Sequence, residues 1–286
     1  MQNLGYYNGE IGLIEEMKVP MTDRGLYFGD GIYDAAIGRN RRIYLKSEHI
    51  ERFFKNAEKM HIRCPYSKDD LSALLDKAVE KSEEECFFVY FQLTRTSRER
   101  RHAYNPNSPS NLLITVTPLA MPNPHRRLKL VTYEDLRYYY CNVKTLNLLP
   151  SVLASGYAEA RSGDEAIFHR DSIVTECAHS NVSIIKNGVL YTHPTGNMIL
   201  PGITRAALLE KCREMNIPFS TISFTLDELY SAEEVLITSS TKLCMLAESV
   251  DDVEYRSNES SLGILLADAL FADFMRETIE QTGKNS

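Results

Sequence analysis

The segment Asn142-Val143-Lys144-Thr145-Leu146-Asn147 places a single lysine among mostly uncharged neighbours near the middle of the chain. A lysine that lies in a pocket loses hydration, which destabilises its ammonium form and makes the amine available as a nucleophile. A surface lysine beside a turn would fit the same six residues equally well. The segments around it have to decide between the two interpretations.

Three further segments could complete a binding site. Glu176 could pair its carboxylate with a buried cation, or could lie in solvent at the end of a strand. The segment 200–205, Leu-Pro-Gly-Ile-Thr-Arg, leads into a helix whose first amides could bind a phosphate group, although a well-capped helix is the commoner case. Residues 238–241, Thr-Ser-Ser-Thr, offer hydroxyls and amides after an apolar strand, or form an ordinary loop.

Hydrophobic periodicity predicts strands and helices mixed along the whole chain. Asn8-Gly9 between apolar runs predicts a hairpin, and Lys186-Asn187-Gly188 predicts a second one leading into 189–192. Ser47 is the expected N-cap of a helix over 47–61, and Ser67 that of the next helix. Strands are expected at 87–94, 112–116, 128–133, 166–168, 182–185, 189–192 and 235–237, and helices at 153–161, 203–214 and from Leu262. Mixed strands and helices with several hairpins favour an α+β fold.

Two prolines in Met121-Pro122-Asn123-Pro124 make this segment the best candidate for a linker. We therefore expect two domains, an N-terminal domain over 1–120 and a C-terminal domain over 121–286. The length of 286 residues is ample for two hydrophobic cores of ordinary size.

The composition excludes several classes of protein. A net charge of -7 argues against nucleic acid as a partner, and no run of about 20 apolar residues predicts a membrane helix. The first residues lack a basic region followed by an apolar run, so we expect no signal peptide and a cytoplasmic location. The six cysteines are scattered without a C-x-x-C pair, which predicts neither a metal site nor disulfides.

Taken in order, these segments resemble the fold type IV enzymes that use pyridoxal 5'-phosphate (PLP), the family of branched-chain and D-amino-acid aminotransferases and aminodeoxychorismate lyases. The resemblance spans nearly the whole chain and implies a two-domain fold with mixed and antiparallel sheets packed by helices, the C-terminal domain binding PLP. It is carried by residues 23–25, 28–33, 48–52, 144–147, 175–176, 180–182, 191–194 and 202–205.

The resemblance implies a role for each candidate residue. Lys144 would hold PLP as a Schiff base and then move the proton between the substrate α-carbon and the cofactor. Glu176 would keep the pyridine nitrogen protonated. The residues implied in phosphate binding are Arg52, the amides of Ile203 and Thr204, and the Ser240 hydroxyl.

The basic loop that contains Arg100 and His102 indicates the kind of substrate. D-amino-acid transaminases of the family carry an R-x-H pair, matched here by Arg100 and His102, and Tyr33 matches the hydroxyl that completes the site for the substrate carboxylate. Without the family, a solvated basic run would be the simpler interpretation. The family is dimeric, so we expect a homodimer in which this loop reaches the partner's active site.

The implied reaction is transamination between a D-amino acid, D-alanine or D-glutamate, and a 2-oxo acid, pyruvate or 2-oxoglutarate. A branched-chain L-amino-acid aminotransferase and an aminodeoxychorismate lyase of the same family remain alternatives. A non-catalytic protein that binds PLP or nucleic acid has only the basic loop in its favour. The sequence departs from its relatives at His179, Tyr138–Tyr140 and Lys242–Met245, and these departures could reshape the side-chain pocket.

Overall fold

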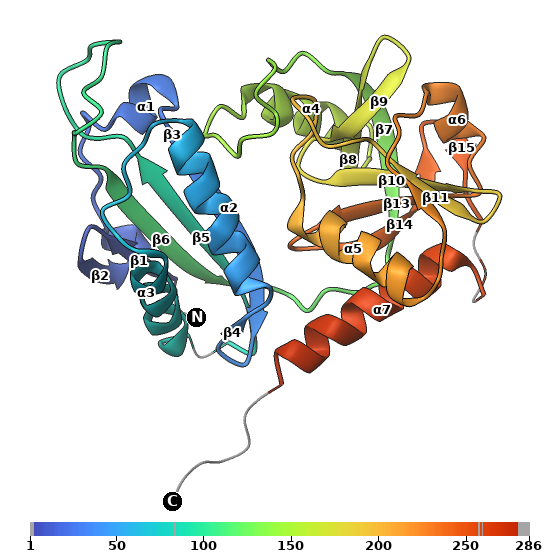
Figure 1. The fold of residues 1–286 in the computed structure, drawn as a ribbon, viewed down its shortest axis with the longest axis horizontal. Coiled ribbons are helices and arrows are strands. Elements are labelled where there is room, and N and C mark those ends of the chain that lie inside the picture. Colours follow the sequence, from blue (N-terminus) through green and yellow to red (C-terminus); the bar gives the residue numbers. More distant parts are fainter. Residues whose placement is uncertain (1–2, 83, 257, 259, 280–286) are drawn as a thin grey trace, which may run out of the picture. The chain divides into compact units, whose positions relative to one another are not determined.

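The computed structural model describes residues 3–82, 84–256, 258 and 260–279 of the chain. Contacts between residues divide the chain into two compact units. The first comprises Met1–Met121, Val143–Asn147 and Phe274–Ser286, and the second Pro122–Asn142 and Leu148–Asp273. Both units combine helices with β-sheet (Figure 1), and the α+β class predicted from the sequence is confirmed. The boundary expected at residues 120 and 121 stays a prediction.

The first unit is built on a six-stranded sheet with the strand order β2-β1-β6-β5-β3-β4. All neighbouring strands of this sheet are antiparallel. Phe53 of the second helix lies 4.9 Å from Phe91 of the sheet, ring centre to ring centre, inside one hydrophobic core. The elements are β1 (Leu4–Tyr7), β2 (Glu10–Leu13), η1 (Ile14–Glu16), α1 (Arg24–Phe28), β3 (Gly31–Arg39), β4 (Arg42–Ile43), α2 (Lys46–Lys59), α3 (Lys68–Glu80), β5 (Cys86–Thr94) and β6 (Asn111–Pro118).

Two hairpins follow the Asn-Gly signals of the sequence. Asn8 and Gly9 join β1 to β2 with φ angles of 47° and 105°, and Asn187 and Gly188 form the second turn with φ angles of 51° and 71°. Positive φ at both central residues matches the right-handed twist of the strands, and Asn and Gly tolerate it best. Both predicted hairpins are confirmed.

The predicted caps of α2 and α3 have different outcomes. Ser67 caps α3 as expected, since its side chain accepts the amide of Asp70 and the Asp70 carboxylate accepts the amide of Ser67. The prediction for Ser47 is wrong, because α2 begins earlier and its N-cap is Leu45 in the left-handed region with φ 50°. Ser47 lies inside the helix and donates its hydroxyl to the Glu48 carboxylate at 2.8 Å.

This difference predicts different costs for two serine substitutions. Ser67→Ala should lower the free energy of unfolding by about 1 kcal/mol, because an amide of the first turn loses its acceptor. Ser47→Ala should change it by less than about 0.5 kcal/mol, since no cap is lost. Urea denaturation of both variants is the measurement, and an equal loss in the two would contradict the assignment of Leu45 as the N-cap.

The second unit is built on a nine-stranded mixed sheet, with the order β12-β11-β10-β13-β14-β7-β8-β9 and with β15 paired to β14. Three neighbouring pairs are parallel, namely β11 with β12, β14 with β7 and β7 with β8. The elements are β7 (Arg127–Glu134), α4 (Leu149–Glu159), β8 (Glu165–Arg170), β9 (Ile173–Cys177), β10 (Asn181–Lys186), β11 (Val189–Thr192), α5 (Ile203–Glu214), β12 (Phe219–Ser220), α6 (Leu226–Tyr230), β13 (Glu234–Ser239), β14 (Leu243–Val250), β15 (Val253–Glu254) and α7 (Leu262–Glu277).

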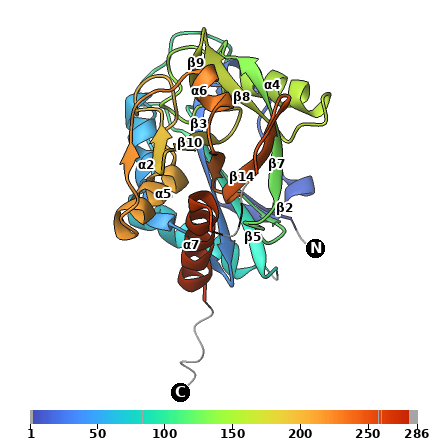
Figure 2. The same ribbon diagram turned by 90° about the vertical axis from the view of Figure 1, so that its right-hand side faces the viewer.

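Helices α5 and α7 share one hydrophobic core with β13 and β14 of this sheet. The ribbons of α5 and α7 can be followed in Figure 2. Leu208 of α5 and Leu266 of α7 are both fully buried there. A second hydrophobic core of this unit is formed by strands of the sheet and the region around α6, which contributes Phe224 and Leu229. Within the described residues, no helix is both long enough and apolar enough to cross a membrane.

The lysine segment Val143–Asn147 belongs by its contacts to the first unit, although its neighbours on both sides belong to the second. The amide of Tyr33 donates to the carbonyl of Lys144 at 2.9 Å, and the amide of Leu146 donates to the carbonyl of Gly31 at 3.1 Å. A Cβ at Gly31 would lie 2.7 Å from both a Leu146 methyl carbon and the carbonyl oxygen of Leu93. The first residues of β3 therefore hold the lysine segment in place.

Candidate active site

Lys144 is half-buried and lies over an aromatic ring. Its Nζ is 4.3 Å from the centre of the Tyr33 ring, which in turn stacks on Tyr90 of β5 at 5.3 Å. In the described part of the chain, no carboxylate lies within ion-pair distance of this amine. A carboxylate partner would stabilise the ammonium form, so its absence among these residues suits an amine that must act as a nucleophile.

Arg52 is fixed by a buried carboxylate. Its Nη2 and Nε donate to the two oxygens of Asp34 at 2.7 and 2.8 Å, and Asp34 is fully buried in β3. His49 lies one helical turn before Arg52 on α2, with its Nδ1 2.7 Å from Asp34. Burial alone would raise the pKa of Asp34, but the charge of Arg52 and the bonds from both side chains hold this pKa well below its usual range.

The ionised state of Asp34 also fixes the form of His49. Burial lowers the pKa of the His49 imidazole, against the opposing effect of Asp34, so the ring is neutral at pH 7. Because an ionised carboxylate can only accept, Nδ1 must be the nitrogen that carries the proton. The cluster of Asp34, His49 and Arg52 therefore carries no net charge.

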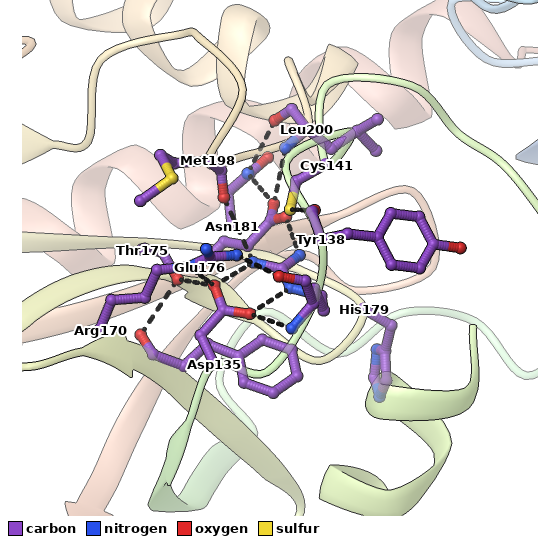
Figure 3. A network of polar contacts seen from close by, with 12 residues as sticks. Asp135, Tyr138, Cys141, Arg170, Thr175, Glu176, His179, Asn181, Met198 and Leu200 are labelled. Atoms are coloured by element: carbon purple, nitrogen blue, oxygen red, sulfur yellow. Dashed lines mark hydrogen bonds and ion pairs between the residues drawn. The ribbon is translucent and has the colours of Figure 1, made fainter. Parts of the chain in front are cut away.

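Glu176 lies at the centre of a polar network in the second unit (Figure 3). Its Oε1 accepts from Arg137 Nη1, and its Oε2 accepts from Asn181 Nδ2 at 2.9 Å and from the Leu200 amide at 3.0 Å. Arg137 also bonds both oxygens of Asp135 at 2.9 Å. With three donors placed on roughly four lone-pair positions, the carboxylate can accept one more proton donor.

Burial decides the proton affinity of Glu176. It raises the pKa of this carboxyl to about 7, although the charge and hydrogen bond of Arg137 and the Leu200 amide act in the opposite direction. The Arg137 guanidinium is further held against the face of Phe168, 4.5 Å from the ring centre.

The start of α5 presents amides that no side chain caps. Its N-cap is Gly202, which has no side chain to offer, and Ile203 and Thr204 form the first turn. A Cβ at Gly202 would lie 2.0 Å from Asn181 Oδ1, so only glycine fits there. Asn181 also donates to the carbonyl of Leu200 at 3.0 Å. This asparagine thus links Glu176 to the helix start, where an anion could accept from free amides.

Ser240 lies in the turn after β13, near Asn181 and therefore near the start of α5. Asn181 of β10 pairs with Thr238 of β13 in the antiparallel register, and Ser240 follows two residues later. The turn is closed by a bond from the Lys242 amide to Ser239 Oγ at 3.2 Å. The second unit therefore groups Glu176, the start of α5 with Ile203 and Thr204, and the turn with Ser240 around Asn181 at the start of β10.

Arg100 and His102 lie on the exposed loop between β5 and β6. The Arg100 guanidinium is 5.1 Å from the centre of the Phe28 ring, and the His102 ring lies 5.1 Å from it. No hydrogen bond, ion pair or ring contact joins either residue to Tyr33 or Lys144 in the described part of one chain. The structure brings Tyr33 and Lys144 together but leaves the two predicted carboxylate ligands apart from them.

Several residues of these networks escaped the sequence reasoning. His49 precedes Arg52 by three positions on a helix, a spacing that places both on one face and could have been noticed. Asp34 directly follows Tyr33 and carried no signal of its own. Asp135 and Arg137 precede the tyrosines at 138–140, and only the fold shows that they surround Glu176.

A family model described as amino-transferase class IV matches residues 31–250. The chain belongs to this family. The resemblance inferred from the order of the motifs is thereby confirmed.

Curated relatives of this aminotransferase are similar over most of its length. A protein of Listeria innocua named D-alanine aminotransferase is 40% identical over 231 residues, which cover 79% of this chain and 80% of the relative. A protein of Staphylococcus epidermidis with the same name is 37% identical over 250 residues, covering 86% and 88% of the two chains.

Solved structures share the fold at lower identity. A branched-chain aminotransferase from Thermoproteus uzoniensis, solved with norvaline, has a TM-score of 0.88 and 20% identity and covers 96% of this chain and 95% of its own. A putative 4-amino-4-deoxychorismate lyase from Legionella pneumophila has a TM-score of 0.82 and 23% identity, with coverage of 92% and 97%. These likenesses confirm the fold type IV architecture of the class IV aminotransferase.

Proposed function

We propose that this class IV aminotransferase transfers the amino group between D-amino acids and 2-oxo acids, with D-alanine and D-glutamate as donors and pyruvate and 2-oxoglutarate as acceptors. The observation that carries the proposal is the 37–40% identity to proteins named D-alanine aminotransferase over about four fifths of both chains. We further propose a cytoplasmic homodimer, as the family resemblance implies.

The proposed cofactor is pyridoxal 5'-phosphate, attached covalently through Lys144 Nζ. The donor set suits it, because Lys144 has no carboxylate partner among the described residues and Glu176 retains room for one more proton donor. Arg52, the amides of Ile203 and Thr204, and the Ser240 hydroxyl are the proposed phosphate ligands. Asp34 keeps the Arg52 guanidinium in one orientation through two hydrogen bonds.

When bound, PLP supplies an electron-withdrawing ring that stabilises negative charge at the substrate α-carbon. The protein supplies the proton transfers. The amine of Lys144, once released by the incoming amino acid, would take the proton from the substrate α-carbon and deliver it to the cofactor, which is the proton shift that transamination requires. Glu176 would accept a hydrogen bond from the protonated pyridine nitrogen, for which its buried carboxylate retains one acceptor position.

Arg100, His102 and Tyr33 are the proposed ligands of the substrate α-carboxylate. Arginine and imidazole N–H groups with a phenol hydroxyl form a donor set that matches the geometry of a carboxylate. In a homodimer, the loop with Arg100 and His102 would serve the active site of the partner. This arrangement agrees with the absence of any contact of these two residues to Tyr33 or Lys144 in the described part of one chain.

A branched-chain L-amino-acid aminotransferase is the second candidate, favoured by the TM-score of 0.88 to the enzyme from Thermoproteus uzoniensis. At 20% identity that likeness concerns the fold, whereas the curated relatives named for D-alanine reach 40%. A lyase acting on aminodeoxychorismate is the third candidate. It would release pyruvate from that substrate without an added amino acceptor.

A spectrophotometric half-reaction tests the proposal. Purified holoenzyme is mixed separately with D-alanine, L-alanine and L-leucine while the absorbance band of the bound cofactor is followed. We expect D-alanine alone to discharge the band. Discharge by L-leucine and not by D-alanine would move the enzyme to the branched-chain group and remove the role proposed for Arg100 and His102.

A further inference from the structure

The loop between β5 and β6 carries Arg100 and His102 in a stretch that forms neither helix nor strand. A side chain that selects a carboxylate must leave the backbone from a fixed point, because a displacement of about 1 Å can reduce the rate by about 100-fold. The exposed residues from Arg98 to Asn107 provide no such point by themselves. Another part of the first unit has to hold them.

Arg24 reaches the backbone of this loop beside Arg100 and His102, whereas Arg95 contacts the loop further on, with its guanidinium 3.7 Å from the centre of the Tyr104 ring. Arg24 is only 4% exposed, and its guanidinium donates Nη1 to the carbonyl of Arg101 and Nη2 to the carbonyl of His102 at 3.1 Å. Its third donor, Nε, bonds the Asp30 carboxylate at 2.7 Å. Within the described residues, no other side chain donates a hydrogen bond to the backbone of residues 99–103.

Arg24 is itself firmly placed. Asp23 caps α1 through the amide of Gly25 at 2.7 Å and accepts from Thr94 Oγ1 and Asn111 Nδ2, both at 2.8 Å. The amide of Arg24 donates to the carbonyl of Thr96 at 3.0 Å. Asp23 is thus bound to both β5 and β6. The backbone of the adjacent Arg24 is therefore anchored to the sheet and not to the loop.

The same element also supports the side chains of the loop. Phe28, at the other end of α1, packs against the His102 ring and the Arg100 guanidinium, each at 5.1 Å. The Arg24 guanidinium lies 4.7 Å from the centre of the same ring. Backbone and side chains at 100–102 are therefore both held by α1.

We propose that Arg24 is a positioning residue for substrate specificity, which fixes the backbone at Arg101 and His102 so that Arg100 and His102 meet the carboxylate of the substrate. The inference rests on the proposed function, since it assigns the loop to an amino acid or 2-oxo acid. Arg24 contacts no reacting atom in this assignment. It acts through Arg100 and His102, because it holds the carbonyls of Arg101 and of His102 itself.

The structure indicates that Arg24 can be replaced without loss of the fold. Asp30 would keep a partner, because Arg95 Nε lies 3.0 Å from both of its oxygens. The carbonyls of Arg101 and His102 belong to exposed residues, so water can replace the lost donors. Arg24→Met keeps the apolar stem of the side chain, and Arg24→Lys keeps its charge but cannot span two carbonyls and a carboxylate.

Steady-state kinetics of the holoenzyme provide the first test. Arg24→Met should raise the KM for D-alanine and pyruvate by about 10-fold or more, the effect expected for one to two charge-assisted hydrogen bonds, with kcat and the cofactor absorbance band nearly unchanged. Arg24→Lys should fall between this variant and the wild type. Arg39→Met is the matched control, since Arg39 pairs with Glu85 at the opposite end of β3.

A double-variant cycle separates positioning from general damage. In an enzyme that already carries Arg100→Ala and His102→Ala, adding Arg24→Met should raise the KM less than twofold, because the residues it positions are gone. A full additional increase in that background would overturn the proposal. An unchanged KM in the single variant Arg24→Met would overturn it as well.

Hydrogen–deuterium exchange provides a readout that needs no substrate. Amides of residues 98–107 should exchange faster in Arg24→Met than in the wild type and in Arg39→Met, and unchanged exchange would refute the anchoring role. If D-alanine fails to discharge the cofactor band, the proposed function fails, and the KM comparison is made with the amino acid that does discharge it. Failure of the function and failure of the positioning role are thus read from different experiments.

Discussion

Replacing Lys144 by alanine is expected to abolish the absorbance band of the attached cofactor and to lower transamination by at least the 10²–10⁴-fold typical of a positioned proton-transferring side chain. The reason is that one amine both attaches PLP and moves the proton at the substrate α-carbon. No other lysine amine in the described residues is recorded over the ring of Tyr33. Initial rates with D-alanine and 2-oxoglutarate are the measurement.

Two further variants make this result specific. Lys144→Arg keeps a positive charge over Tyr33 but offers no primary amine, so it should be as inactive as Lys144→Ala while retaining the fold. Lys59→Ala removes an exposed lysine of α2 and should keep full activity. Near wild-type turnover in Lys144→Ala would contradict the central assignment, and activity retained only in Lys144→Arg would reduce the role of Lys144 to its charge.

Local signals of the sequence predicted the elements that depend on local chemistry. The Asn8-Gly9 and Asn187-Gly188 turns and the Ser67 cap are each decided by a few adjacent residues, and all are present. The helix start at Leu45 was missed because a leucine in the left-handed region gives no signal in the sequence. A tertiary setting imposes that conformation against the ordinary preference of the residue.

Contacts between distant residues lie beyond such signals. Arg52 pairs with the buried Asp34, and Arg137 pairs with the buried Asp135 and Glu176. The residues next to these carboxylates in the sequence do not indicate that they are buried. The attachment of the segment Val143–Asn147 to β3 likewise results from pairing across more than 100 positions. The candidate residues followed from the family resemblance, whereas the networks that hold them required the fold.

Two residues that were expected to depart from the family pattern, His179 and Lys242, meet at one carboxylate. Glu165 is fully buried in β8 and accepts the amide of His179 at 2.9 Å and Lys242 Nζ at 2.6 Å. The Ser180 hydroxyl donates to the same side chain at 2.9 Å. His179, through its amide, and Lys242, through its ammonium group, are therefore bound to the same buried carboxylate, although the sequence presented them as two unrelated positions.

Replacing Arg137 by methionine is expected to lower the free energy of unfolding of the cofactor-free protein by about 3–5 kcal/mol, the range for breaking a buried ion pair by removal of one partner. Asp135 would keep Arg170 and the Thr175 hydroxyl at 3.1 and 3.0 Å. Glu176 would keep only neutral donors, so the loss should arise mainly at this carboxylate. Urea denaturation at pH 6 and pH 9 is the measurement.

The pH dependence identifies the group responsible for this loss. Burial raises the pKa of Glu176 from 4.5 to about 7 while Arg137 opposes the rise, so the pKa should move higher still in Arg137→Met. Between the unfolded and folded pKa values the folded state binds the additional proton, and the free energy of unfolding falls by about 1.4 kcal/mol per pH unit as the pH rises. This window ends near pH 7 in the wild type and extends higher in the variant.

The destabilisation by Arg137→Met should therefore be larger at pH 9 than at pH 6, and Glu176→Gln added to Arg137→Met should remove the difference. An equal penalty at both pH values would show that Arg137 stabilises the fold through Asp135 and Phe168 instead of through the charge of Glu176.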